Sequence, residues 1–361
     1  MRIKSHLDHF AGRKSYVKGL PGEGILNCAL GTNPFGVSEK VLLAARNYHW
    51  ADIYYYPDPF HKGLRQALTR FWADFSDLKE EQIQIAGGAM AVLERLNKIF
   101  IENGSTVLGY SPQFTEYVTE IEASGGRYEA VVLKPEENFE FNTQRLLKMM
   151  SHEHCLVYLD NPNNPTGQVI SLEKIEEIIL EAGKKGIVVI IDEAFGDYWG
   201  RRNSAIKLVN KYQNLIVIRT FSKGFGLAAL RVGYGVFPLK LVQYYEKVNV
   251  PFAADAVGCH LAKEALSDME FISKCQEMVK REKGKLLEGL KQRGYLISKT
   301  LDSCPIFVLG HPDKTLDLNQ QLLLQGILTE SGKDFRNLEN NYARVNIPLK
   351  ANDFLDRLYQ L

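Results

Sequence analysis

The stretch RTFSKGFGLAALRVGYG (residues 219–235) places Lys223 directly after a serine in a glycine-rich turn, and Arg231 follows eight positions later. Two apolar runs, at 215–218 and 232–236, flank this turn, and such runs predict buried strands. Lysine is normally exposed because its charge favours water. A lysine at the end of a buried strand is therefore a candidate for a lowered pKa and for covalent chemistry.

The composition is typical of a soluble globular enzyme, since 45% of the 361 residues are hydrophobic and 24% are charged. One hydrophobic core does not usually serve so long a chain, so we expect a large and a small domain. The net charge of +1 gives no reason to expect nucleic acid or an anionic membrane as a partner.

The five cysteines lie far apart and include no CxxC pair, which argues against a disulfide framework or a zinc site. The N-terminal stretch MRIKSHLDHF has no apolar core of a signal peptide. No apolar run approaches membrane-spanning length. We therefore expect a cytoplasmic protein without a bound metal.

The middle of the chain alternates short apolar runs with amphipathic stretches, which predicts an α/β fold with a mainly parallel sheet covered by helices. One helix is expected at 172–184, where apolar residues form a single stripe. The expected strands lie at 83–87, 106–110, 155–160, 187–192, 215–220 and 231–236.

From about residue 250 the sequence changes to long charged helices, of which 271–294 is one. We interpret its charges as a solvated face. This change predicts a large domain at 31–248 and a smaller C-terminal domain at 249–361. The N-terminal segment, 1–30, is expected to join the smaller domain.

Polar groups follow several of the expected strands, where open α/β sheets bind ligands. In YLDNPNNPTGQ (158–168), prolines and a glycine force a turn that would project the amide of Asn164, although a plain turn is an equal alternative. Asp192 ends an aliphatic run, where a carboxylate needs a cationic partner, unless it simply caps a helix. Glu193 should point to the opposite side, so the two form no acid/base dyad.

A phosphate group would satisfy the remaining polar residues. Ser222 and Arg231 offer a hydroxyl and a planar fork, and AGGAMAV (86–92) offers the free amides of a helix that begins after Gly88 and Ala89. A single ligand with a phosphate, a protonated ring nitrogen for Asp192 and an aldehyde for Lys223 is pyridoxal 5′-phosphate.

With these motifs in order, the sequence resembles the fold type I pyridoxal-phosphate enzymes of the class I/II aminotransferase family. Within that family it is similar to histidinol-phosphate aminotransferases and threonine-phosphate decarboxylases. The resemblance runs from LGTNPFG near residue 30, through YYPDP, NPNNPTG, DEAF and RTFSKGFGLAALRVGY, to YARVNIP near 345. It implies a mostly parallel seven-stranded sheet in the large domain, a smaller α+β C-terminal domain, and a homodimer with shared active sites.

The resemblance also implies roles for individual residues. Lys223 would form the Schiff base and carry the proton, and Asp192 would keep the ring nitrogen protonated. Asn164 would donate to the ring's 3-oxygen. Phe114 matches the aromatic residue that stacks on the ring, Tyr56 the tyrosine that reaches the neighbouring subunit, and Arg344 the arginine for the substrate carboxylate. The positions that match the phosphate cup are Gly88, Ala89, Met90, Ser222 and Arg231.

Three of these assignments have alternatives. Phe114 could be a core residue, and Tyr56 has two tyrosine neighbours that could take its place. Arg336 could compete with Arg344, but ARVNI reads as a strand aimed into a core, which favours Arg344.

The sequence departs from the family pattern at several positions. Phe195 stands where the aminotransferases usually have tyrosine, and Gly31 and Ala229 also differ. Glu330, in GILTES, stands where relatives that act on phosphorylated substrates tend to have arginine. An acidic residue would repel a substrate phosphate. Our hypothesis is that the substrate is not a phosphate ester.

The leading interpretation is an aminotransferase that moves an amino group between an L-amino acid and a 2-oxo acid. The main alternative is a decarboxylase of the threonine-phosphate type, which Phe195 favours. A non-catalytic binding module on the same fold is disfavoured because Lys223 is present. A nicotinamide dehydrogenase is disfavoured because no GxGxxG follows a first strand.

Overall fold

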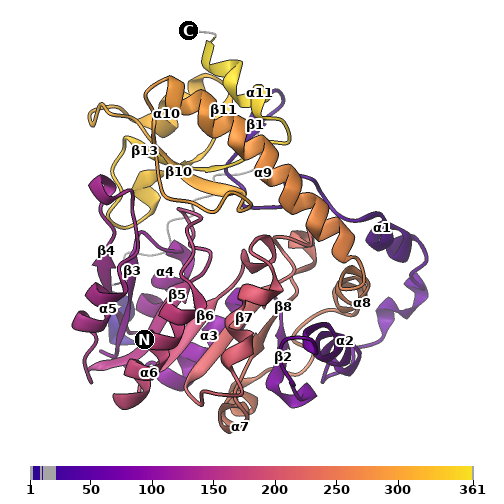
Figure 1. Cartoon of the computed structure of the whole chain (residues 1–361). Coiled ribbons are helices and arrows are strands. Elements are labelled where there is room, and N and C mark those ends of the chain that lie inside the picture. The colour runs from indigo at the N-terminus through magenta and orange to yellow at the C-terminus, as the bar shows by residue number, and fades with distance from the viewer. Residues whose placement is uncertain (1–2, 9, 11–21, 360–361) are drawn as a thin grey trace.

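The centre of the structure, a computed structural model that describes residues 3–8, 10 and 22–359, is a seven-stranded sheet (Figure 1). Its order is β2-β8-β7-β6-β5-β3-β4, and the strands from β7 to β4 are parallel while β8 is antiparallel to both of its neighbours. The strands are β2 (Ile83–Ala86), β3 (Thr106–Ser111), β4 (Arg127–Val132), β5 (His154–Asp160), β6 (Val188–Asp192), β7 (Leu215–Thr220) and β8 (Gly233–Val236).

Helices cover both faces of this sheet, which explains why its strands are apolar without alternation. In β5, Val157 and Leu159 pack into the core beneath α6, whereas Leu156 and Tyr158 pack into a second core beneath α3 and α4. The helices of this part of the chain are α1 (Glu39–Arg46), α2 (Lys62–Trp72), α3 (Ala89–Phe100), α4 (Thr115–Ala123), α5 (Thr143–Met149), α6 (Leu172–Lys184), α7 (Leu239–Val248) and α8 (Ala256–Ala265).

The predicted strands and the helix at 172–184 are confirmed, with two differences. The edge strand β4 was not predicted, because half-exposed residues break its apolar run. The last strand begins at Gly233 rather than at 231, because Arg231 adopts a left-handed conformation with φ of 49°. Non-glycine residues in that region are uncommon and often mark functional sites.

The smaller domain contains a four-stranded sheet in the order β12-β13-β10-β9, against which the long helix α9 packs (Figure 1). A parallel pair, β1 with β11, lies beside it. Its elements are α9 (Met269–Gln292), β9 (Leu296–Ile297), β10 (Ile306–Gly310), α10 (Leu318–Leu324), β11 (Ile327–Leu328), β12 (Glu330–Ser331), β13 (Tyr342–Asn346) and α11 (Ala351–Leu355), together with β1 (Leu26–Asn27).

Packing bears on the predicted domain limits. The buried residues of α8 and Ile272 of α9 belong to the core of the large sheet, whereas Val279 and later residues of α9 belong to the core of the small sheet. We therefore propose a boundary within α9 rather than at 249. Within 1–30, β1 does pair with the small domain, but His6 Nε2 lies 3.1 Å from the carbonyl oxygen of Ala123 in the large domain. Residues 1–2, 9 and 11–21 lie outside the described residues.

The charged helix at 271–294 is only partly solvated, so that interpretation was wrong for two residues. Glu282 and Lys283 are buried. Glu282 accepts from the backbone N–H of Ala351 at 3.0 Å, at the start of α11. The charges therefore also tie the helix to its own domain.

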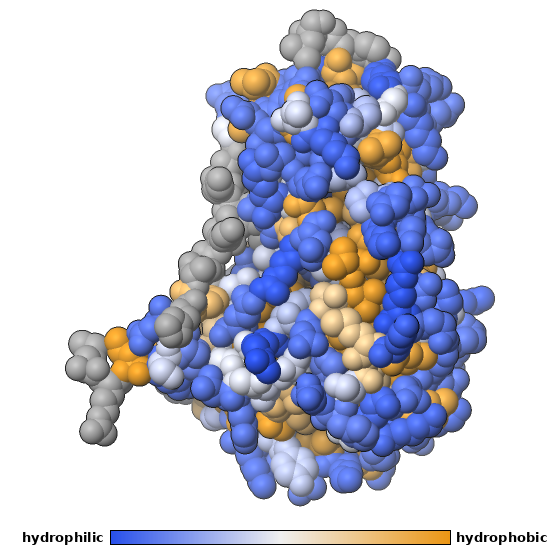
Figure 2. All heavy atoms as spheres, turned by 90° about the vertical axis from the view of Figure 1, so that its left-hand side faces the viewer, coloured by the Kyte–Doolittle hydropathy of each residue, from blue (hydrophilic) through white to orange (hydrophobic). Residues whose placement is uncertain are grey.

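The surface in Figure 2 is mostly hydrophilic, with hydrophobic atoms gathered along the middle of this face, between the upper and lower lobes. Within the described residues, every helix is too short or too polar to cross a membrane.

Candidate active site

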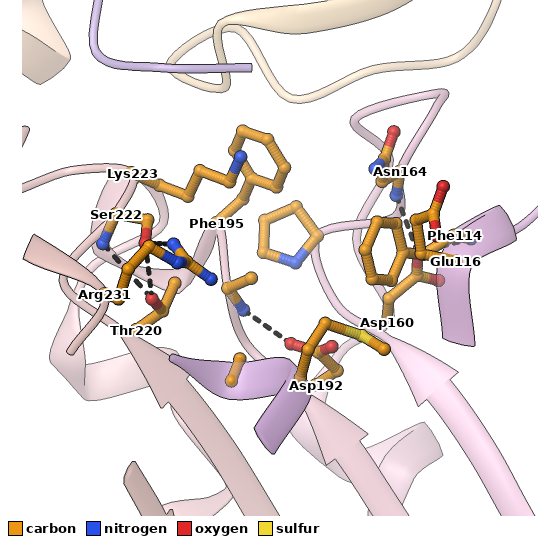
Figure 3. Close-up of a pocket in the computed structure, with 14 residues that line it drawn as sticks. Phe114, Glu116, Asp160, Asn164, Asp192, Phe195, Thr220, Ser222, Lys223 and Arg231 are labelled. Carbon is orange, nitrogen blue, oxygen red and sulfur yellow. Dashed lines mark hydrogen bonds between the residues drawn. The ribbon is translucent and has the colours of Figure 1, made fainter. Parts of the chain in front are cut away.

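A cavity of about 270 Å³ opens at the carboxyl ends of the central strands, where the last residues of β5, β6 and β7 all face it (Figure 3). Parallel sheets present their ligand sites at this edge. The cavity is lined by Ala89, Met90, Phe114, Glu116, Asp160, Pro162, Asn164, Asp192, Ala194, Phe195, Thr220, Ser222, Lys223 and Arg231.

Lys223 extends into this cavity over the side chain of Phe195, with Nζ 5.1 Å from the centre of the ring (Figure 3). Burial lowers the pKa of Lys223 to about 7, and the positive charges of Arg344 and Arg231 act in the same direction. Asp192 opposes this shift. A large fraction of the amine is thus unprotonated near neutral pH, which is the state that attacks a carbonyl group.

Asp192 lies on the floor of the cavity and is 2% exposed. Its carboxylate accepts from the Tyr158 hydroxyl and from the Ala194 backbone N–H, both at 3.0 Å. Burial raises the pKa of Asp192 to about 7, with a further contribution from the charge of Asp160. A cation bound above this carboxylate would compensate for its burial. Glu193 points away, as predicted, and pairs with Arg219 at 2.8 Å.

Donor groups gather at the other end of the cavity. Arg231 Nη1 lies 3.2 Å from Ser222 Oγ, whose hydroxyl is 2.9 Å from that of Thr220. The amino end of α3 meets them there, because a Cβ on Gly88 would lie 2.5 Å from Arg231 Nη2. A side chain at residue 88 would displace this guanidinium, and the φ of 89° is one that glycine favours. Helix amides, hydroxyls and a guanidinium together form an anion site.

Phe114 and Asn164 line the same side of the cavity, across from Lys223 and Arg231 (Figure 3), and the structure brings Arg344 to Asn164. Arg344 Nη1 donates to Asn164 Oδ1 at 3.1 Å, and Nη2 donates to the carbonyl of Ala29. This orients the Asn164 amide so that its NH2 is the group available to the cavity. Arg336, the competing arginine, pairs instead with Glu122 near the surface.

Glu330 lies beside Arg344 rather than in the cavity lining. The two residues are paired in register between β12 and β13, and Glu330 Oε1 is 3.8 Å from Arg344 Nη2. Glu330 is 1% exposed. Burial raises its pKa to about 8, although Arg344 acts to lower it.

Tyr56 is the predicted residue that the structure keeps away from the cavity of its own chain. It is 83% exposed, and its ring centre lies 5.0 Å from that of Phe252. Its predicted role in a neighbouring subunit stays a prediction.

Several residues of the site were not predicted from sequence: Tyr158, Asp160, Thr220 and Glu116. Asp160 and Thr220 end strands next to β6, so the rule that located Asp192 could have located them. Tyr158 and Glu116 gave no comparable signal, because Tyr158 reads as a core residue and Glu116 as part of a surface helix.

The sequence matches the family Aminotransferase class I and II over residues 23–359. The chain belongs to this family. It is 28% identical to histidinol-phosphate aminotransferase of Methanocaldococcus jannaschii over 334 residues, which cover 91% of this chain and 86% of that protein. It is 33% identical to chloroplastic histidinol-phosphate aminotransferase 1 of Arabidopsis thaliana over 280 residues, 77% of this chain and 64% of that protein.

Solved structures share the fold of this aminotransferase. Histidinol-phosphate aminotransferase from Sinorhizobium meliloti, in complex with pyridoxal 5′-phosphate, has a TM-score of 0.80 at 22% identity, covering 98% of this chain and 96% of that one. Aspartate aminotransferase from Thermus thermophilus with maleate has a TM-score of 0.81 at 21% identity, covering 92% and 91%. The predicted fold class, with its mostly parallel seven-stranded sheet, is confirmed.

The residues present fit pyridoxal 5′-phosphate, the cofactor that membership of this family supports. The anion site suits its phosphate, and the buried carboxylate of Asp192 suits a protonated ring nitrogen. Lys223 supplies a partly neutral amine within the same cavity. The aminotransferase is therefore a cofactor-dependent enzyme, as the sequence predicted.

Proposed function

We propose that this aminotransferase moves an amino group between an L-amino acid and a 2-oxo acid, and that its amino donor is not a phosphate ester. The observation that carries the second part is Glu330, whose buried carboxylate lies 3.8 Å from Arg344. When Glu330 is ionised, a substrate phosphate brought to this position would meet a negative charge, and the protonated carboxyl offers the phosphate no cation in place of arginine. The relatives named histidinol-phosphate aminotransferase make histidinol phosphate the first compound to compare.

When bound, pyridoxal 5′-phosphate supplies an aldehyde that captures an amino group and a ring that accepts electrons from the substrate's Cα. We assign the chain's part as follows. Lys223 Nζ carries the proton, because its lowered pKa lets it both accept and release one near pH 7. Asp192 holds a positive charge on the floor of the cavity. Arg344 binds the substrate carboxylate, and Asn164 and Phe114 would orient the cofactor's ring.

The test is to mix the cofactor-loaded enzyme with single amino acids and with histidinol phosphate, and to follow the cofactor absorbance. We expect amino acids to convert the bound cofactor to its amine form. A clear preference for histidinol phosphate would end the proposal that the substrate is unphosphorylated. Borohydride reduction followed by peptide mapping should label Lys223, and an unlabelled lysine would contradict its assigned role.

A decarboxylase remains the second candidate, because Phe195 places a hydrocarbon ring rather than a phenol beside Lys223. Release of carbon dioxide, with the absorbance of the bound cofactor returning to its starting form, would favour that reaction. Retention of the amine form would favour transamination.

We also propose a homodimer with shared sites, in which Tyr56 contacts the neighbouring subunit. Trp50, Tyr54, Tyr55 and Phe60 are exposed near it, and exposed apolar groups of this kind favour an interface. Sedimentation should show a dimer that Tyr56→Ala weakens. Leu324→Ala is the control, because Leu324 is equally exposed on the small domain. A monomeric wild-type protein would contradict the proposal.

A further inference from the structure

A single carboxylate binds the backbone at two residues, Phe114 and Asn164, that line one side of the cavity. Asp160, the last residue of β5, accepts through Oδ2 from the backbone N–H of Asn164 at 2.9 Å and from that of Phe114 at 3.3 Å. Phe114 precedes α4 and Asn164 lies in the turn after β5, so no regular element joins them. Asp160 therefore holds these two segments of the chain against each other.

The other oxygen of Asp160 is held just as firmly. Oδ1 accepts from the Tyr110 hydroxyl at 2.8 Å, from Asn163 Nδ2 at 3.0 Å and from Gln113 Nε2 at 3.1 Å. Five donors thus surround one side chain that is 4% exposed. Such a set suits an ionised carboxylate, which accepts hydrogen bonds and donates none.

Asp160 also stands directly beside Asp192. The two are partners in register on the parallel strands β5 and β6, and both line the cavity. Side chains at paired positions of parallel strands point to the same face. A second buried carboxylate therefore lies next to the one assigned to the cofactor's ring.

We propose that Asp160 is a positioning residue that fixes the distance between Phe114 and Asn164 and adds a second negative charge beneath the bound cofactor. This inference rests on the proposed cofactor site and goes further, because it assigns the cofactor's environment to a residue outside the set predicted from sequence. The charge should favour protonation of any cationic group of the cofactor, in the same direction as Asp192.

The tyrosines around Asp160 stay neutral, so a change in charge at this cluster can be assigned to Asp160. Tyr110, Tyr128 and Tyr158 are buried, and burial raises the pKa of each well above its usual value, so they stay neutral. Asp192 is its paired neighbour in register, and Glu116 and Lys223 line the same cavity. Burial raises the pKa of Asp160 to about 6, while its donors oppose this shift.

The experiment compares Asp160→Asn with Tyr110→Phe. The first variant removes the charge, and its amide cannot accept at both positions. The second removes a donor from the same cluster but keeps the charge and the bonds from the backbone N–H groups of Phe114 and Asn164. Each apoprotein is titrated with pyridoxal 5′-phosphate by tryptophan fluorescence, each loaded protein is titrated with pH by cofactor absorbance, and thermal unfolding of the apoproteins reports the fold.

We expect Asp160→Asn to weaken cofactor binding about tenfold to a hundredfold. Its absorbance midpoint should move about one pH unit lower, because an anion near a cation is lost. Tyr110→Phe should keep the wild-type midpoint and affinity, even if it lowers thermal stability as much. Asp160→Glu keeps the charge but misplaces it, so it should weaken binding with a midpoint near that of the wild type.

Asp160→Cys is a second neutral variant if the asparagine protein does not fold. Wild-type affinity and midpoint in a folded neutral variant would overturn the proposal, as would equal effects of Tyr110→Phe. A wild-type protein that does not bind the cofactor would instead overturn the proposed function.

Discussion

Glu330 and Arg344 face each other on the antiparallel strands β12 and β13, with 3.8 Å between the carboxylate oxygen and the guanidinium nitrogen. Both are almost completely buried. An ionised Glu330 therefore neutralises Arg344, and an anion that binds Arg344 must compete with it. Because burial raises the pKa of Glu330 to about 8, its charge changes close to neutral pH.

This relationship predicts a pH-dependent KM. Below about pH 8, Glu330 is mostly protonated and Arg344 offers its full charge to a substrate carboxylate. Above that pH, the ionised Glu330 neutralises Arg344 and repels the substrate. We expect the KM for a 2-oxo acid, whose carboxylate does not titrate in this range, to rise about threefold to tenfold between pH 7 and pH 9.

Glu330→Gln should keep a low KM across this range. Glu339→Gln, an exposed carboxyl in the following loop, is the control and should retain the wild-type profile. A profile that persists in Glu330→Gln would assign the titration to another group.

Much of the sheet and several groups of the site were predictable, because their signals are local. The strands of the large domain are buried on both faces, so their apolar runs are continuous in sequence, and polar residues at their ends fall at one edge. Lys223, Asp192 and Asn164 were recognised in this way. The edge strand β4 carries no such run, because exposed and half-exposed residues separate its buried ones.

The contacts that sequence could not predict depend on residues far apart in the chain. Glu330 was interpreted as part of the substrate site, but its register with Arg344 follows from pairing of two short strands. Lys283 was interpreted as solvated because its neighbours are charged, whereas carbonyl groups of a later loop surround it. The charges of neighbouring residues in the sequence therefore do not show which groups a charged side chain will contact in the folded chain.

We predict that a substitution at Gly31 affects the active site more than the stability of the fold. A Cβ at this position would lie 3.2 Å from Phe195 Cζ and 3.3 Å from Lys223 Nζ. Gly31→Ala should therefore displace the end of Lys223 and lower kcat about tenfold, while unfolding changes by less than about 1 kcal/mol. Gly63→Ala is the control, because its Cβ would meet nothing within 4 Å. Unchanged kcat in Gly31→Ala would show that Lys223 can be displaced without cost.

We predict a large loss of stability when Arg219 is replaced. It pairs with Glu193 at 2.8 Å and also with Asp197, and all three side chains are buried. Arg219→Leu leaves two buried carboxylates without their cation, so we expect the free energy of unfolding in urea to fall by about 3–5 kcal/mol. Arg145→Leu breaks the exposed pair with Glu137 and should change stability little. Similar losses in both variants would contradict this account.

Lys283 has a structural role in the small domain. Its ammonium donates to Thr300 Oγ1 at 2.6 Å and to the carbonyls of Cys304, Leu301 and Ile306 at 2.8, 2.9 and 3.1 Å. This loop contacts the turn that carries Asn164, since the Leu301 N–H donates to the Gly167 carbonyl at 2.9 Å. The ammonium thus fills a cage of oxygens that a small cation could also occupy.

Lys283→Ala should lower the free energy of unfolding by about 3 kcal/mol or more, because four acceptors lose their shared donor. Methylammonium or potassium ions should restore part of that loss by entering the cage. Lys283→Met should be destabilised but not restored, because its side chain fills the space without donating. Lys280→Ala, an exposed position on the same helix, controls for lost charge. Urea unfolding with and without each cation, at constant ionic strength, measures the effect, and equal responses of Lys283→Ala and Lys283→Met would contradict the cage.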